Sequence, residues 1–145
     1  MKIFFNLFFI FLILTVKSQE PYNIHYTIND GLPTNKVYSA YENSDGSIWF
    51  ATDVGLVKFN GYKFTLLTTE DGLTDNEVFH IKNDYKGRKW LLTLNGKPSF
   101  IFNNKVYGSQ NSSIIKQFES KSLLTNFYEE NKTIYISSRR GSISV

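Results

Sequence analysis

The side chains that could bind a ligand in this sequence are two tryptophans and a set of acidic and amide residues. Trp49 and Trp90 offer flat aromatic faces on which a sugar ring could stack, although such side chains more often fill a core. Asn35, Asp71 and Asn76 fall in polar stretches between predicted strands. Asp and Asn are also favoured in turns, because their side chains bond the nearby backbone. Ligand contact and turn formation therefore both stay open for these three residues.

The sequence carries no signature of catalysis or of metal binding. It has no cysteine, and His25 and His80 each lie in a predicted strand without a second histidine at a metal-ligand spacing. No glycine-rich phosphate loop and no serine nucleophile motif occurs. The acidic residues are spread through turns, which gives no support to a two-carboxylate glycosidase site. We predict no catalytic residue, metal or cofactor in this segment, and whether a longer protein is an enzyme stays open.

The residues of interest belong to an internal repeat with a spacing of 41 residues. A period near 40 that is built from short strands and glycine turns is typical of a β-propeller blade. Because Trp49 and Trp90 hold the same position of the repeat, we expect both to pack between blades. The positions that keep their residue are Asp30, Gly31, Leu32, Asn35, Val37, Gly46, Trp49, Thr52 and Gly55 in the first copy and Asp71, Gly72, Leu73, Asn76, Val78, Gly87, Trp90, Thr93 and Gly96 in the second.

Strands and turns can be placed within each copy. Asp45-Gly46 and Asn60-Gly61 are residue pairs of tight hairpin turns. A third, degraded copy at a shift of 45 has Tyr135 in place of Trp90 and keeps Gly141. The predicted strands are 37–41, 48–52, 56–59 and 62–67 in the first copy, 78–82, 89–93, 100–102 and 105–107 in the second, and 123–128 as the first of the third.

These elements predict an all-β fold made of β-propeller blades of four antiparallel strands. The array is incomplete, with about two and a half blades: blade one at about 29–69, blade two at about 70–110 and a partial blade three at about 118–145. The connection at 108–117 is polar, Ser-rich and without periodicity. The alternation in 22–28 predicts an orphan outer strand at the amino terminus, of the kind that completes the last blade of a closed propeller.

Residues 1–18 resemble a secretory signal peptide. Lys2 is followed by a nearly continuous apolar run from Ile3 to Val16, and small or short residues surround the predicted cleavage position. The alternative is a membrane anchor, but a spanning helix needs about 20 apolar residues. We expect an exported protein.

The charge of the remaining chain does not favour nucleic-acid binding. The formal net charge is +3, and Lys2 and Lys17 of the leader account for two of these charges. Arg88-Lys89 and Arg139-Arg140 are the adjacent basic pairs, and both lie beside predicted turns. A phosphate backbone is bound by clusters of Lys and Arg, so we predict no nucleic-acid surface in this segment.

The phrase Asp-Gly-Leu-Pro, continued by Asp-Gly-Ser-Ile-Trp-Phe-Ala-Thr and Gly-Leu-Val-Lys-Phe-Asn-Gly, resembles the two-component regulator propeller repeat. That family occurs in exported sensor regions of bacterial signalling proteins. The resemblance covers the chain from about Asn29 onward and assigns a structural role to repeat residues Gly31, Leu32, Gly46, Trp49, Thr52, Gly55, Gly72, Leu73, Gly87, Trp90, Thr93, Gly96 and Gly141.

The resemblance implies a sensor that detects an extracellular or periplasmic ligand, such as a small molecule or oligosaccharide. It also implies further blades and a downstream membrane helix that tethers the protein to the inner membrane. A histidine kinase or regulator would follow in the same polypeptide, with a dimer as the full-length form. The alternative is an exported propeller lectin or glycan-active enzyme without a signalling role. A spanning helix and an output module encoded after Val145 would favour the sensor.

Overall fold

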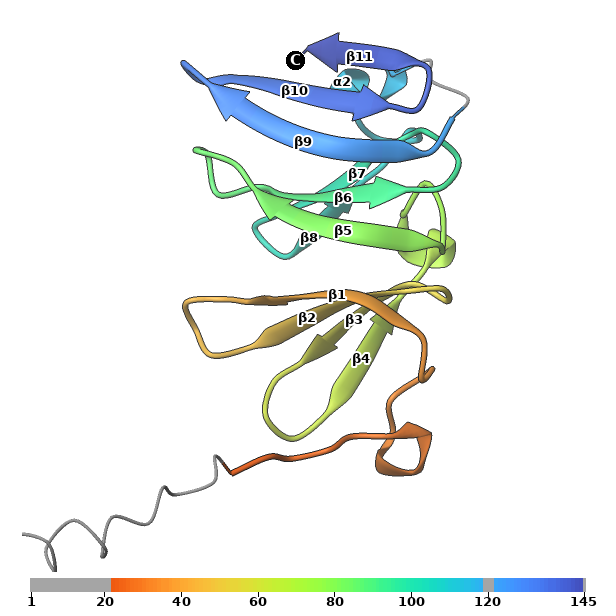
Figure 1. The fold of residues 1–145 in the computed structure, drawn as a ribbon, viewed down its shortest axis with the longest axis vertical. Coiled ribbons are helices and arrows are strands. Elements are labelled where there is room, and N and C mark those ends of the chain that lie inside the picture. Colours follow the sequence, from red (N-terminus) through yellow and green to blue (C-terminus); the bar gives the residue numbers. More distant parts are fainter. Residues whose placement is uncertain (1–21, 119–121, 145) are drawn as a thin grey trace, which may run out of the picture.

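The computed structural model describes residues 22–118 and 122–144. The predicted signal peptide, residues 1–18, lies outside the described residues. Three antiparallel sheets follow one another along the chain and are stacked face to face (Figure 1). Two of them have four strands, which confirms the predicted four-stranded blades.

Blade one is a meander of β1 (Val37–Glu42), β2 (Ile48–Thr52), β3 (Leu56–Phe59) and β4 (Phe64–Leu67), hydrogen-bonded in that order. Blade two repeats it with β5 (Val78–Asn83), β6 (Lys89–Thr93), β7 (Ser99–Phe102) and β8 (Lys105–Tyr107). The third sheet contains β9 (Leu124–Glu130), β10 (Thr133–Ser138) and β11 (Gly141–Ser144). The predicted strand positions agree with these bounds to within two residues because glycine turns punctuate the sequence.

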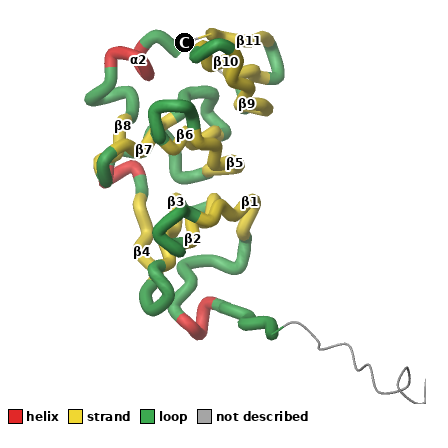
Figure 2. Tube along the Cα trace, turned by 90° about the vertical axis from the view of Figure 1, so that its left-hand side faces the viewer, coloured by secondary structure: helices red, strands yellow, loops and turns green. Residues whose placement is uncertain are grey.

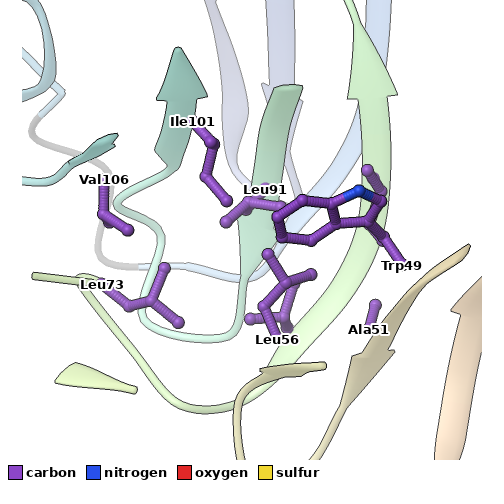
Figure 3. Close-up of a cluster of buried hydrophobic side chains, with 9 residues drawn as sticks. Trp49, Ala51, Leu56, Leu73, Leu91, Ile101 and Val106 are labelled. Carbon is purple, nitrogen blue, oxygen red and sulfur yellow. The ribbon is translucent and has the colours of Figure 1, made fainter. Parts of the chain in front are cut away.

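Two buried clusters hold the sheets together. The first lies between blades one and two and contains Trp49, Ala51, Leu56, Leu73, Val78, Ile81, Leu91, Ile101 and Val106 (Figure 3). The second lies between blade two and the third sheet and contains Trp90, Leu92, Phe100, Ile115, Phe118, Leu124, Ile134 and Ile136. Blade two therefore buries one face against blade one and the other against the third sheet. Units of a repeat protein are stabilised by such contacts with their neighbours.

The connection between blade two and the third sheet contains the short helix α2 (Ser113–Lys116), which the sequence did not predict. The Ser112 side chain accepts a hydrogen bond from the Ile115 amide and caps this turn. Ile115 is fully buried in the second cluster. The polar stretch is thus a capped turn that inserts one apolar side chain between the sheets.

The predicted amino-terminal strand at 22–28 is not a strand in the structure. Residues 28–30 instead form the 3-10 turn η1 (Ile28–Asp30), whose capping box joins Thr27 and Asp30. Tyr26 packs on the face of blade one that points away from blade two (Figure 1). Its ring centroid lies 4.9 Å from that of Phe59 and 5.5 Å from that of Phe64. Strand pairing needs a neighbouring strand, and the described residues offer none beside this segment.

Candidate ligand-binding site at the inner strands

Strands β1, β5 and β9 run along one side of the stack, whereas β4 and β8 lie on the other (Figure 2). β1 also contacts β5 directly. We call these first strands the inner strands, because the corresponding edge of propeller blades lines the central channel. Ligand-binding side chains on this edge would face the same space.

Each inner strand carries an irregularity in its pairing at the same repeat position. The register with the next strand shifts between Val37 and Ser39 in β1 and between Val78 and His80 in β5, which leaves Tyr38 and Phe79 unpaired. In the third sheet the shift leaves Thr125 unpaired. Bulges of this kind re-aim a side chain and are frequent beside functional sites.

The two bulge aromatics meet across the seam between blades one and two. The rings of Tyr38 and Phe79 lie 4.6 Å apart between centroids at an angle of 37°. The Tyr38 hydroxyl donates a hydrogen bond of 2.7 Å to Oε1 of Glu77. Adjacent blades thus share one half-buried aromatic surface with a phenol and a carboxylate at its edge.

A cation and a second carboxylate stand next to this surface. The Lys36 Nζ atom lies 4.0 Å from Oδ2 of Asp53 and 5.6 Å from the centre of the Tyr38 ring. Oδ1 of Asp53 and Oγ of Ser39 are buried atoms that hydrogen-bond to no other described residue. Unsatisfied buried oxygens are costly, and a bound ligand or water would satisfy them.

We call Lys36, Tyr38, Asp53, Glu77 and Phe79 the inner-strand site. Contacts within the site raise the pKa of two members. The hydrogen bond to Glu77 raises the pKa of the Tyr38 phenol, which therefore stays protonated and keeps its donor role. The neighbouring Tyr38 side chain, helped by Asp53, raises the pKa of the Lys36 ammonium. The site presents a largely exposed cation, two carboxylates and an aromatic face, a combination suited to a polar ligand with an apolar side.

The residues predicted as ligand contacts are engaged in the turns that precede the inner strands. Oδ2 of Asp71 accepts from the Thr68 amide at 2.8 Å and closes the capping box of the 3-10 turn η2 (Thr69–Asp71). Oδ1 of Asn76 accepts from the Thr69 amide at 2.8 Å. Oδ1 of Asn35 accepts from the Ile28 amide at 3.3 Å, at the equivalent place in η1. Their side-chain oxygens thus hold turns, and these residues lie outside the inner-strand site.

The predicted structural residues lie at the seams and turns. Trp49 is buried in the first cluster and Trp90 in the second, each facing the following sheet. The Thr52 hydroxyl donates to the Gly55 carbonyl at 2.6 Å, and the Thr93 hydroxyl donates to the Lys97 carbonyl at 2.7 Å. Leu32 and Leu73 are buried, and the remaining repeat residues, Gly31, Gly46, Gly55, Gly72, Gly87, Gly96 and Gly141, all have positive φ.

Blade two also contains a buried polar network that the sequence analysis missed. Oδ2 of Asp84 accepts from Nε of Arg88 at 2.5 Å and from Nε1 of Trp90 at 2.8 Å. The Arg88 guanidinium lies 5.1 Å from the centre of the Trp90 ring. Burial acts to raise the pKa of the Asp84 carboxyl, but the hydrogen bonds from Trp90 and Arg88 together lower it below its usual value. This network fixes the turn between β5 and β6 to the indole.

The sequence analysis also missed all five members of the inner-strand site. A signal was present, because the shift of 41 pairs Tyr38 with Phe79 and Lys36 with Glu77. An aromatic residue is kept at one position while the charge is reversed at the other. A position that packs in the same way in every blade keeps one kind of side chain. The change of charge from Lys36 to Glu77 therefore indicates a position outside the shared packing, where a site can differ between blades.

The part of the chain that the structure describes has no group of three or more His, Asp or Glu side chains that could hold a metal ion. Among the same residues, no helix is long and apolar enough to cross a membrane.

The chain matches known proteins in its repeat and in its fold. The family model described as two component regulator propeller matches residues 31–54. The structure is similar to the extracellular domain of a putative hybrid two component system from B. thetaiotaomicron, with a TM-score of 0.63 and 24% sequence identity. The match covers 80% of this chain and 15% of that chain. No curated protein matches. These findings confirm the predicted propeller blades and the predicted repeat family.

Proposed function

From the two-component regulator propeller repeat that this chain carries, we propose that it forms part of an exported sensory propeller. The propeller binds an extracellular polar ligand, such as a carbohydrate, at the inner-strand site. Further blades and signalling domains in the same polypeptide complete the protein, which acts as a periplasmic dimer tethered to the inner membrane. The repeat match is the observation that carries this proposal, and the similarity to an extracellular domain supports it.

The inner-strand site supports ligand binding rather than catalysis. Tyr38 and Glu77 come from different blades and share a hydrogen bond of 2.7 Å, so a ligand seated there contacts two blades at once. Ligand contacts that differ in strength between two blade arrangements shift the population between them. Such a shift is the physical form in which occupancy can pass to a downstream domain.

The proposal is tested with a double variant of the full chain, Lys36→Ala with Tyr38→Ala. The matched control is Tyr62→Ala with Lys63→Ala, since both side chains are exposed in the turn between β3 and β4. Purified proteins are titrated with a panel of extracellular carbohydrates by calorimetry. Cells that carry the same variants are exposed to the ligands that bind, and their transcripts are measured.

We expect the site variant to weaken binding by about tenfold or more, because it removes an ammonium and a phenol that bond the ligand. The transcriptional response is expected to shift to higher ligand concentration by the same factor, and the control variant is expected to match the wild type. Binding with no transcriptional response would overturn the sensory role and favour a lectin. Turnover of a carbohydrate by the purified protein would favour a glycan-active enzyme.

A further inference from the structure

Trp49 and Trp90 hold equivalent repeat positions, but their indole nitrogens differ in hydrogen bonding. Nε1 of Trp90 donates to the Asp84 carboxylate, which also binds Arg88. A shift of 41 places Asn43 and Ser47 of blade one where blade two has Asp84 and Arg88. Nε1 of Trp49 is buried and has no hydrogen-bond partner among the described residues. Blade one therefore lacks the internal carboxylate that blade two provides.

Two lysines gather at the Trp49 ring from both sides of the seam between blades one and two. The Lys58 ammonium lies 5.2 Å from the centre of the ring and comes from β3. The Lys89 ammonium lies 5.9 Å from it and comes from β6 of the next blade. Desolvation lowers the pKa of Lys89, the negative charge of Asp45 partly opposes this, and the positive charge of Lys58 adds to the lowering. A half-buried pair of like charges calls for a counter-anion.

The described residues do not supply that anion at contact distance. Their ion pairs are Lys36–Asp53 and Arg88–Asp84, and neither includes Lys58 or Lys89. Asp45 is the acid whose charge acts on both lysines. Its Oδ1 atom accepts hydrogen bonds from the Ser47 amide at 2.9 Å and from the Ser47 hydroxyl at 2.5 Å. The two ammonium groups keep hydrogen-bonding capacity for a ligand.

A pocket opens beside Lys58, whereas Lys89 is not one of the residues that line it. Trp49 and Lys58 line it together with Thr65, Leu67, Ile101, Asn104 and Val106, so that β3 and β4 face β7 and β8 across it. Figure 3 shows Trp49, Ile101 and Val106 as members of the buried cluster at this seam. The volume is about 230 Å³. Ligand pockets for drug-sized molecules begin at roughly 300 Å³, which limits the occupant to a small molecule.

We propose that this seam pocket binds a small carboxylate with an apolar body, held by Lys58 beside Trp49. Lys89, whose ammonium lies 5.9 Å from the centre of the same ring, adds its positive charge from the next blade. The aliphatic walls of Leu67 and Val106 receive the apolar body, and the Lys58 ammonium binds the carboxylate. The site is separate from the inner-strand site and uses the opposite side of the blades. The proposal therefore stands without the sensory role.

Benzoate tests the proposal, because it combines a flat apolar ring with one carboxylate. The full chain is titrated with benzoate and with its neutral isostere benzamide by calorimetry. We expect benzoate to bind at one site per chain and benzamide to bind at least about tenfold more weakly, because charge-assisted hydrogen bonds are about twice as strong as neutral ones. Equal affinity for the two compounds, or no benzoate binding, would overturn the proposal.

The variants Lys58→Gln and Lys89→Gln locate the site. Lys58→Gln is expected to weaken benzoate binding by about tenfold, because Lys58 lines the pocket, and Lys89→Gln to weaken it by a smaller factor. Lys63→Gln, an exposed change in the neighbouring turn, leaves it unchanged. Far-ultraviolet circular dichroism checks that each variant is folded. Should one variant fail to fold, the other and the comparison of benzoate with benzamide still decide. Retained affinity in the folded lysine variants would place the carboxylate elsewhere and contradict the proposal.

Discussion

Asp84 is the residue whose loss we expect to cost the most stability. Its carboxylate is buried and satisfies both Arg88 and Trp90. The variant Asp84→Ala leaves a buried guanidinium unpaired, and breaking a buried ion pair in this way costs about 3–5 kcal/mol. Urea unfolding measures the loss. Asp45→Ala, at the exposed turn of blade one, is the matched control and is expected to lose much less; equal losses would contradict the role of the network.

The same carboxyl gives the stability a pH dependence. The pKa of Asp84 is lower in the folded protein than in the unfolded chain, so its contribution is complete above the unfolded value of about 4. The contribution is lost as the pH falls through the folded-state pKa. Urea unfolding of the wild type at pH 6 and pH 3 should show a larger loss than Asp84→Ala shows over the same interval. Parallel losses in both proteins would argue against it.

Gly55, in the turn between β2 and β3, shows how the elements constrain each other. It has a φ of +147°, and a Cβ atom there would lie 2.3 Å from the Leu67 carbonyl oxygen. We expect Gly55→Ala to destabilise the protein by about 3 kcal/mol or more through backbone strain and overpacking. Gly46→Ala is the control, since it has a φ of +78° and open space at Cβ, and should cost only about 1–2 kcal/mol. Thermal unfolding of both variants gives the comparison, and equal costs would exclude the contact with Leu67.

Turn glycines and alternating apolar residues predicted the strands of each blade, because these signals lie within a few residues of the strand that they define. Gly46 and Gly55 bracket β2, so the strand 48–52 followed from the sequence alone. The strand predicted at 22–28 is absent, because no described strand lies beside it to pair with and the capping box of Thr27 and Asp30 turns the chain at its end. The sequence alone did not predict the inner-strand site, because Tyr38 contacts Glu77 only when two blades are stacked.

The whole molecule is a stack in which each sheet covers the next. A chain that ends at Tyr107 lacks the third sheet and exposes Trp90, Leu92 and Phe100 of blade two. We expect this truncated protein to bind a hydrophobic dye strongly and to unfold at a lower temperature, because blade two loses its only cover on that face in the described chain. Dye fluorescence and calorimetric melting measure this. A truncated protein with unchanged melting and no dye binding would show that the sheets are independent.

The bulge in each inner strand has an evolutionary consequence. Tyr38, Phe79 and Thr125 pair with no residue of the neighbouring strand, so mutations there alter neither the hydrogen-bond ladder nor the blade cores. These side chains therefore differ from blade to blade on the same strand pairing, and the Tyr38–Phe79 contact couples those of blades one and two. A substitution at this one place in each copy can thus change the surface of the inner strands without changing the strand pairing.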